Sequence, residues 1–397
     1  MTPLHAVPSL FRAPAPAACL LCVAALALLC GAPSNARAGG EHAANLTVFY
    51  PVGTNQDPDI DTHLRLSLLY GRVGSVRGVD LNGGVSLVGR DLQGLQLTGL
   101  YSRVGGAFSG LAATGLVGNF ASDATGVQLT GLVNVVRGDL TGLQYAGLFN
   151  FTAGDVHGVQ VTAVFNVSRG EGGFLQLAGV ANSHDGDFGG AQLGGVNFVT
   201  GRCRGLQLGL GNFAAESRGL QAGLVNLTGH AQGLQLGLVN YSRRHDGLPV
   251  GLLNLEAETG GVDWLVFGSN LALAGTGVRT EVGSWYAMTW LGYGDARHDG
   301  DKTVFLGWNY GYGVAIDRAW RLGLDLGFVH IIPEKQDDPG INDALHFALQ
   351  ARVLVELRIS RQVAAFAGGG LSRLHAAYAL GADKETEAHV VAGVALY

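Results

Sequence analysis

Three adjacent histidine–aspartate pairs are the residues of this chain that come closest to acid–base chemistry. They are His184–Asp185, His245–Asp246 and His298–Asp299. Histidine titrates near neutral pH, and a carboxylate beside it can orient the ring and stabilise its charged form, so such a pair can act as a general base. Each pair stands in a stretch that is typical of turns or loops, where both residue types are common. We therefore expect solvated turn residues rather than catalytic ones.

Two short motifs have alternative functional interpretations. The sequence HDGDFGG at residues 184–190 resembles a calcium-binding turn, but its carboxylates do not recur from one repeat to the next, as a row of calcium sites would require. The tripeptide RGD at Arg137–Asp139 could be an adhesion motif. The same position in the neighbouring repeats holds Ala153–Asp155 and Arg169–Glu171. We expect turns in both places.

Five Asn-x-Ser/Thr triplets begin at Asn45, Asn150, Asn166, Asn226 and Asn240. Four of them are simply the asparagine position of the repeat described below, so they do not indicate glycosylation.

No complete catalytic constellation is visible in the sequence. It has no phosphate-binding loop, no nucleophile elbow, no HExxH motif and no Cys/His cluster. We therefore predict no catalytic, cofactor-binding or metal-binding residues, no cofactor, and a protein that is not an enzyme. The rival hypothesis is an envelope hydrolase that works from acidic loop residues. Its candidates are Asp295, Asp299, Glu334 and Asp337.

The first 38 residues have the features of a secretory signal peptide. Arg12 supplies a positive charge, Ala17–Cys30 is an apolar stretch, and Ala36–Ala38 has the small-x-small pattern of a cleavage site. Cleavage there would remove three of the four cysteines and leave Cys203 alone, which excludes a disulfide framework. It would also leave 23 basic against 31 acidic residues, a net charge of −8 that argues against a nucleic-acid partner.

A short repeat fills the middle of the chain. Glutamine recurs every 16 residues at Gln128, Gln144, Gln160, Gln176 and Gln192, and the step then shortens to 15 and 14. A parallel series of asparagines runs from Asn134 to Asn254. About twelve units span Arg77 to Asn254. The glycines recur every few residues and exclude helices, whereas the Val- and Leu-rich segments favour strands.

Two β architectures fit the repeat. In a β-solenoid with one coil per repeat, each Gln and Asn stacks on its own copy about 4.8 Å away and forms amide ladders. In a transmembrane barrel with one strand per repeat, alternate residues face lipid. The solenoid is favoured because Gln and Asn lie five apart in the 14-residue units, as in Gln235 and Asn240. This odd spacing would point one of them at lipid.

The last third of the chain predicts an antiparallel barrel of the outer-membrane type. Eight alternating segments begin near Val262, and all five tryptophans lie among them. The connections alternate between tight turns, such as Ile316–Ala319, and long charged loops, such as Pro333–Asp343. The chain ends on an alternating strand with Tyr397. The predicted divisions are a signal peptide (1–38), N-terminal strands (39–76), the β-repeat region (77–255) and the barrel segment (256–397).

The stretch GLQLGLVNYSRRHDGLPVGLLN, followed by an aromatic β segment, resembles a family of bacterial surface-repeat proteins of the outer membrane. That resemblance covers about Leu64 to Tyr397 and implies a location at the outer membrane or cell surface, not an activity. The expected function is display, scaffolding or adhesion, with outer-membrane lipid as a partner. The alternative is a pore or transport barrel with a lumen lined by Gln and Asn.

Overall fold

The computed structural model describes residues 40–294, 303–333, 346–376 and 386–397. It is an all-β protein with a parallel β-solenoid of about 14 turns followed by a closed antiparallel barrel of eight strands. The predicted fold class is confirmed, and so is the solenoid as the architecture of the repeats. The chain divides into two compact units, Met1–Gly219 and Leu220–Tyr397, so the last coils belong with the barrel.

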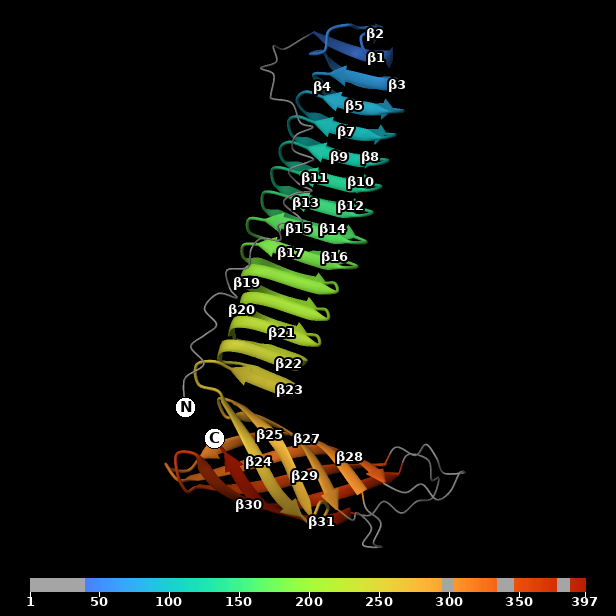
Figure 1. Ribbon diagram of the computed structural model, residues 1–397. Coiled ribbons are helices and arrows are strands. Elements are labelled where there is room, and N and C mark those ends of the chain that lie inside the picture. Colours follow the sequence, from blue (N-terminus) through green and yellow to red (C-terminus); the bar gives the residue numbers. More distant parts are fainter. Residues whose placement is uncertain (1–39, 295–302, 334–345, 377–385) are drawn as a thin grey trace, which may run out of the picture. The chain divides into compact units, whose positions relative to one another are not determined.

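The strands of the first unit form the coils shown from blue to green in Figure 1. They are β1 Glu41–Phe49, β2 Val52–Gly53, β3 Asp61–Val73, β4 Ser75–Asn82, β5 Val85–Val88, β6 Leu92–Thr98, β7 Tyr101–Val104, β8 Phe108–Thr114, β9 Val117–Phe120, β10 Ala124–Thr130, β11 Val133–Val136, β12 Leu140–Ala146, β13 Phe149–Thr152, β14 Val156–Thr162, β15 Phe165–Arg169, β16 Leu175–Ala178, β17 Ala181–Asp185, β18 Phe188–Leu193, β19 Val196–Leu208 and β20 Gly211–Ala222, whose last residues cross into the second unit.

The second unit adds three more solenoid strands and the barrel. The solenoid strands are β21 Val225–Ala231, β22 Leu234–His245 and β23 Leu248–Glu256. The barrel strands are β24 Gly261–Ser269, β25 Ala274–Val282, β26 Trp285–Gly294, β27 Thr303–Ala315, β28 Trp320–Pro333, β29 His346–Arg358, β30 Val363–Ala376 and β31 Thr386–Leu396.

One coil of 16 residues illustrates the repeat. Strand β10 leads through the corner Gly131–Leu132 into β11, and the turn Arg137–Asp139 returns the chain to the next coil. Neighbouring coils pair in parallel without a shift, so that Gln128 lies beside Gln144 and Asn134 beside Asn150. Identical residue types therefore meet along the stack, as the ladder interpretation predicts. The parallel pairing already begins between β1 and β3.

The corner explains how Gln and Asn can both face inward in the 14-residue coils, although their spacing is odd. In β22, Gln235 and Asn240 are five residues apart, yet both are buried. A flat strand would send them to opposite faces. Here the chain bends around the interior between the two residues, so both point inward. The 14-residue unit is two residues shorter than the 16-residue one. It lacks the interior threonine that Thr130 represents, and its path from the asparagine to the next glutamine, as from Asn226 to Gln235, is also one residue shorter.

Glycine is required where the strands bend. Gly126 and Gly142 have φ values of 115° and 126°, a conformation that L side chains rarely adopt. A Cβ on Gly142 would also lie 2.2 Å from the carbonyl oxygen of Gly126 in the preceding coil. Both the backbone angle and the close stacking therefore explain why glycine recurs at this position.

The eight barrel strands match the predicted segments to within a few residues. Each pairs antiparallel with the next, and β24 pairs with β31 to close the barrel. Alternation along β28 places Leu322, Leu324, Leu326 and Phe328 outside, all exposed, while Asp325 is buried inside.

Candidate interaction surface

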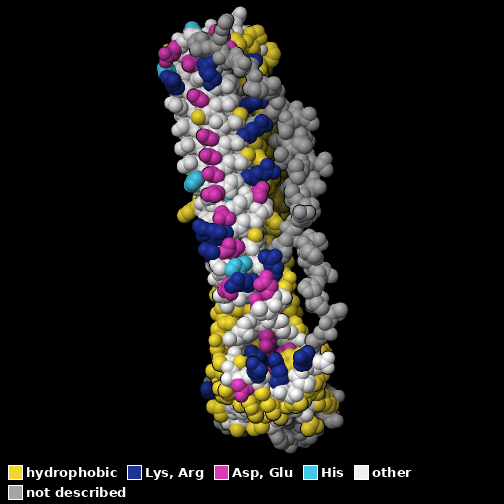
Figure 2. Space-filling view, turned by 90° about the vertical axis from the view of Figure 1, so that its left-hand side faces the viewer, with side chains coloured by type: hydrophobic (Ala, Val, Ile, Leu, Met, Phe, Trp, Pro, Cys, Tyr) yellow, Lys and Arg dark blue, Asp and Glu magenta, His cyan; other side chains and the backbone are white. Residues whose placement is uncertain are grey.

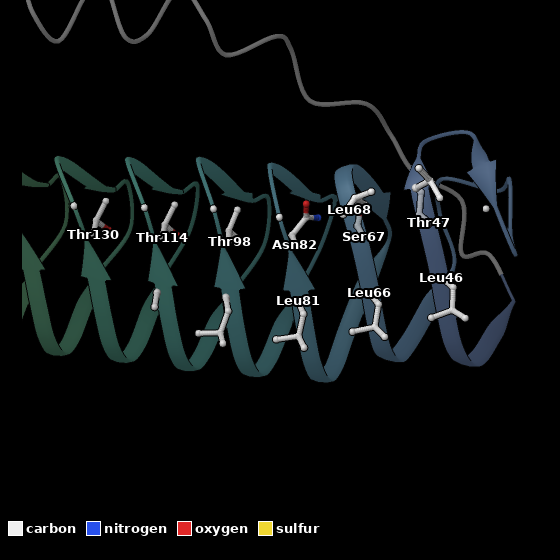
Figure 3. Close-up of a pocket in the computed structure, with 18 of the residues that line it drawn as sticks. Leu46, Thr47, Leu66, Ser67, Leu68, Leu81, Asn82, Thr98, Thr114 and Thr130 are labelled. Carbon is white, nitrogen blue, oxygen red and sulfur yellow. The ribbon is translucent and has the colours of Figure 1, made fainter.

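A groove with a volume of about 1290 Å³ runs along the first unit from β1 to β12. One wall is a row of outward side chains, one from each coil. Figure 3 shows the first three, Leu46, Leu66 and Leu81, side by side in this row. The row continues in register as Leu97, Ala113, Leu129 and Tyr145. Because the coils keep their register, a single position of the repeat becomes a continuous apolar wall.

The floor of the groove has few side chains. It consists of the corner glycines Gly83, Gly99, Gly115 and Gly131, beside a row of largely buried polar residues that includes Thr98, Thr114 and Thr130 (Figure 3). Residues of β1 and β2, among them Val48 and Val52, line its N-terminal end. None of the described residues that line the groove carries a charge. The groove therefore fits an uncharged, apolar ligand.

The apolar surface continues around the corner of each coil. A second exposed row follows the corner glycine, with Leu132 39% exposed and Leu148 47% exposed. The other exposed members of this row in the first unit are Leu100, Leu116, Val180 and Leu210. Valine and phenylalanine side chains of the shorter strands, such as Val133 and Phe149, lie next to it, partly buried. In the coils of β10 to β15, the outside from the groove wall to the shorter strands is thus apolar.

The opposite edge of the coils is polar. The turns stack so that the Oδ1 of Asp139 accepts a hydrogen bond from the backbone N–H of Asp155, 2.8 Å away, and Asp155 accepts one from Glu171 in the same way. Asp91, Asp123 and Asp187 make the equivalent contact. Figure 2 shows these turns as a single file of acidic side chains. The carboxylates are therefore occupied in fixing the turns.

The interior of the solenoid holds two columns of hydrogen-bonded amides. In the first, the Nε2 of Gln160 donates to the Oε1 of Gln144 at 2.7 Å, and the contact repeats through Gln176, Gln192 and Gln207. In the second, the Nδ2 of Asn150 donates to the Oδ1 of Asn166 at 2.9 Å. It repeats through Asn182, Asn197 and Asn212. These buried polar groups thereby satisfy one another.

Both columns are interrupted in the coil of β8 and β9. Ala112 takes the glutamine position and Gly118 the asparagine position. In the next coil the amides of Gln128 and Asn134 are buried and make no hydrogen bond with the described residues. The rings of Phe108 and Phe120, 4.9 Å apart, fill the interior here. An apolar plug therefore separates the amide columns from the first coils.

A buried ion pair occupies the first coils in place of the glutamine ladder. Arg65 and Asp80 stand in the glutamine position, both fully buried, and two nitrogens of Arg65 donate to the two carboxylate oxygens at 2.6 Å. Gln96 donates to the same carboxylate at 2.9 Å, and Ser86 also contacts it. A bidentate pair with added hydrogen bonds satisfies a charge that would otherwise be costly to bury.

The interior of the barrel is filled by charged and aromatic side chains. Asp325 accepts hydrogen bonds at 2.9 and 3.0 Å from Arg352, and further bonds from Asn309 and Tyr286. Nearer the short turns, Arg279 pairs with Asp263, Glu281 and Glu356, and Glu356 also accepts from Tyr397. An eight-stranded barrel has interior space for side chains and little else.

The last coil, β23, is hydrogen-bonded to the outer wall of the barrel within the second unit. Trp308 Nε1 donates to the carbonyl of Gly251 at 3.2 Å, and the hydroxyl of Tyr310 donates to that of Pro249 at 2.6 Å. Thr289 reaches the carbonyl of Leu252. These donors come from the outward face of β26 and β27, and they satisfy carbonyls at the final edge of the solenoid.

Comparison with known proteins gives no relative. No family model, curated protein or solved structure matches this chain. The resemblance to bacterial surface-repeat proteins thus stays a prediction. Within the described ranges, no helix is long and apolar enough to cross a membrane.

The first predicted His–Asp pair does not form an acid–base site. His184 is fully buried in the solenoid, with Nδ1 2.7 Å from Ser168 Oγ and Nε2 3.1 Å from the carbonyl of Asp187. Burial lowers the pKa of this imidazole. Asp185 is exposed and accepts a hydrogen bond from Thr200. The side chain expected to be solvated is therefore the interior one, because β17 sends alternate residues inward.

The second pair is divided in the same way. His245 is buried, and burial lowers its pKa to about 4. Asp246 is outside and contacts His230 at 2.7 Å. The third pair, His298–Asp299, lies outside the described residues, as do the loop carboxylates Asp295, Glu334 and Asp337.

The remaining motifs are parts of the coil. RGD is the stacked turn described above, and the asparagines of all five Asn-x-Ser/Thr triplets are buried. Burial raises the pKa of the Cys203 thiol to about 12, so this cysteine is a core residue. Among the residues that the structure covers, no group of three or more His, Cys, Asp or Glu side chains could hold a metal ion.

Sequence reasoning missed two features, the outward leucine rows of the solenoid and the charged network inside the barrel. The outward leucine rows were visible in the repeat, since Leu follows most of the glutamines, as at Leu129, and most often stands two residues before the asparagine, as at Leu132. A repeat alone does not tell which positions face outward. The sequence did contain a signal from which the barrel network of Arg279 and Arg352 could have been predicted. Charged residues recur within otherwise apolar alternating strands, which indicates a polar interior.

Proposed function

We propose that this chain is a non-catalytic protein of the bacterial outer membrane, in which the barrel is the anchor and the solenoid is a display or scaffolding platform. The observation that carries the proposal is the polarity of the barrel. Its wall exposes Leu324, Leu326 and Val353, whereas Asp325 and Arg352 are buried inside. A water-soluble barrel has the opposite arrangement, and a barrel in lipid has this one.

The filled interior supports an anchor rather than a channel. Arg279 of β25 reaches across the interior to Glu356 of β29, whereas Arg352 pairs with Asp325 of the neighbouring strand β28. Trp290 and Phe305 are buried with them. The alternative function, a pore lined by Gln and Asn, would need the repeats to be transmembrane strands. Their parallel pairing instead turns both residue types into a closed interior.

The architecture of the solenoid supports the role of a platform, because the number of coils does not depend on the geometry of an active site. Each coil contacts its neighbours, and the coils repeat the same surface along the stack. Such a surface suits extended contact with a partner, whereas an enzyme needs a unique cluster of reactive groups. A hydrolase that uses the loop carboxylates is the rival. A broad hydrolase screen repeated with Asp295→Ala, Asp299→Ala, Glu334→Ala and Asp337→Ala would reveal loop-dependent turnover if that rival were correct.

Fractionation and conductance test the proposal. The protein is expected in the outer-membrane fraction with an N-terminus near Gly39, and recovery in the cytosol with Met1 intact would refute the location. In planar bilayers the purified protein is expected to give no stable large conductance steps. Such steps would favour the pore.

A further inference from the structure

The coils of the first unit are amphipathic in cross-section. In the coil of β10 and β11, Leu129 and Leu132 are exposed, and Val127, Val133 and Val135 lie beside them on the outside, partly buried. The charged residues of that coil, Arg137 and Asp139, belong to the returning turn. The register does not change, so the same division holds in the coils that follow, up to that of β14 and β15. The solenoid thus has an apolar half and a polar half along its stacked coils.

An apolar surface of this extent requires an occupant. Soluble monomers rarely expose contiguous apolar patches larger than a few hundred Å². Here the exposed rows include side chains on coil after coil, from Leu97 in β6 to Leu177 in β16. At about 4.8 Å per coil, the groove wall from Leu46 to Tyr145 alone is roughly 29 Å long, which exceeds the ~15 Å depth of one leaflet's hydrocarbon.

The chemistry of this half favours lipid over a protein partner. Its backbone N–H and C=O groups are used between coils. From the coil of β10 and β11 to that of β14 and β15, its outward side chains carry no charge. The first coils add Arg72 and Arg103, which stand in the same position as Val135. Each coil presents nearly the same residues, so no position is distinguished as a specific pocket for a side chain. A surface that is uniform, apolar and without unsatisfied polar groups is what contact with hydrocarbon requires.

The interior of the solenoid supports the same conclusion. The glutamines and asparagines are turned inward and satisfied in columns, as Gln160 and Asn166 show, while the leucines are turned outward. The barrel has the same inverted polarity. In both the solenoid and the barrel, polar side chains face inward and apolar side chains face outward. This arrangement is adapted to apolar surroundings.

Within the second unit, the outer wall of the barrel adjoins an apolar part of the last coil. Trp308 and Tyr310 project from the wall that faces lipid in the proposed anchor, and both hydrogen-bond to β23. Leu252 and Leu253 of that strand are exposed, at 39% and 37%. Lipid chains that surround the barrel would therefore also reach the last coil.

We propose that the apolar half of the solenoid lies against the acyl chains of a lipid leaflet, with the row of acidic turns facing water. The proposal deepens the proposed function and rests on it for the presence of a membrane beside the barrel. The groove between the leucine row and the corner glycines is the place where individual acyl chains would lie.

Site-specific fluorescence in vesicles tests this contact. A chain that starts at Gly39 and carries Cys203→Ala has no native thiol. Single cysteines are introduced as Leu129→Cys and Leu132→Cys on the apolar half, and as Thr141→Cys on the polar half, and each is labelled with an environment-sensitive fluorophore. Leu326→Cys on the barrel wall is the reference for lipid contact. The protein is folded into phosphatidylcholine vesicles with or without lipid that carries a doxyl quencher on its acyl chains.

At residues 129, 132 and 326 we expect a blue-shifted emission, and we expect the quencher lipid to remove most of the emission intensity. At residue 141 we expect neither change. Quenching at 326 alone would overturn the lipid contact and leave the anchor intact. Quenching at 129 and 132 without 326 would support the contact and refute the anchor. A blue shift at 129 and 132 without quenching would mean that protein covers this half, which also overturns the proposal. Far-UV circular dichroism of each labelled protein identifies any variant that has not folded, and Leu177→Cys then replaces the position lost.

Discussion

Gln160 donates a hydrogen bond from its Nε2 to the Oε1 of Gln144 across 2.7 Å of the solenoid interior, although 16 residues separate them. Both side chains are fully buried. The same nitrogen also contacts the hydroxyl of Thr152. The recurrence of glutamine in the sequence is therefore a property of neighbouring coils, each of which supplies the partner that the other needs.

Breaking this contact should destabilise the coils around it. In Gln160→Leu, the amides of Gln144 and Gln176 each lose a buried partner, which should cost on the order of 2 kcal/mol. The matched control is Gln128→Leu. The amide of Gln128 is already buried without a partner among the described residues, so its removal should be nearly neutral or stabilising. Hydrogen exchange of β10–β16 peptides measures both effects, and equal costs would contradict the ladder interpretation.

Removing one member of the barrel network should weaken the barrel strongly. Arg352→Ala leaves the buried carboxylate of Asp325 without its cation and should cost about 3–5 kcal/mol. Arg361→Ala, in the exposed turn after β29, should change stability very little. The measurement is the unfolding temperature of the barrel, which is the temperature at which its band on a gel moves from the position of the folded protein to that of the unfolded one. A barrel that keeps its wild-type midpoint with Arg352→Ala would argue that the network is not a determinant of stability.

The second unit should lose stability in mild acid through His245. Burial, opposed by Asp246, lowers the pKa of this histidine from 6.5 to about 4. A neutral imidazole is therefore favoured in the folded state, and the unfolded state binds more protons below pH 6.5. Its contribution is complete above pH 6.5 and is lost as the pH falls towards 4, by up to roughly 3 kcal/mol.

His245→Gln provides the comparison for this pH dependence. The variant should show a shallower decline in the protection of β21–β23 between pH 6.5 and 4, after correction for intrinsic exchange rates. If protection declined with pH equally in the wild type and in His245→Gln, groups other than His245 would cause the acid sensitivity.

The register of the coils can be tested by cross-linking. Leu129 and Tyr145 are Cα partners on the outside of adjacent coils, so the double variant Leu129→Cys/Tyr145→Cys, with Cys203→Ala, should form a disulfide readily. In an antiparallel hairpin centred on Asp139, Leu129 would instead lie opposite Phe149. The pair Leu129→Cys/Phe149→Cys is therefore the control. Preferential oxidation of that pair would reject the solenoid.

Periodicity made most of the fold predictable. The 16-residue step placed Gln128 beside Gln144, and the alternation of the last third located the barrel strands closely. The odd spacing of Gln235 and Asn240 argued against a flat strand but did not give the bend between them, because sequence spacing does not give the direction of a turn. The apolar plug at Phe108 and Phe120 was not anticipated, since it depends on two substitutions, Ala112 and Gly118, that look minor in the repeat.

The candidate surface was less predictable than the fold. His184 and His245 were expected in solvent because Asp and Gly surround them, yet each occupies an interior position of its strand. Whether Leu129 faces outward depends on the closed shape of the coil, which no single strand reveals. The ion pairs of Arg279 join residues up to 77 positions apart, and only the closure of the barrel brings them together.

The two amide columns of the solenoid run in opposite senses. From Gln160 to Gln207 the glutamines donate to the coil before, as Gln176 does to Gln160. From Asn150 to Asn197 the asparagines donate to the coil after, as Asn166 does to Asn182. The dipole moments of the two columns therefore point in opposite directions and largely cancel. The interior can grow by whole coils without accumulating an electric field from one end to the other, so the number of repeats is free to change without attracting or repelling ions at the ends.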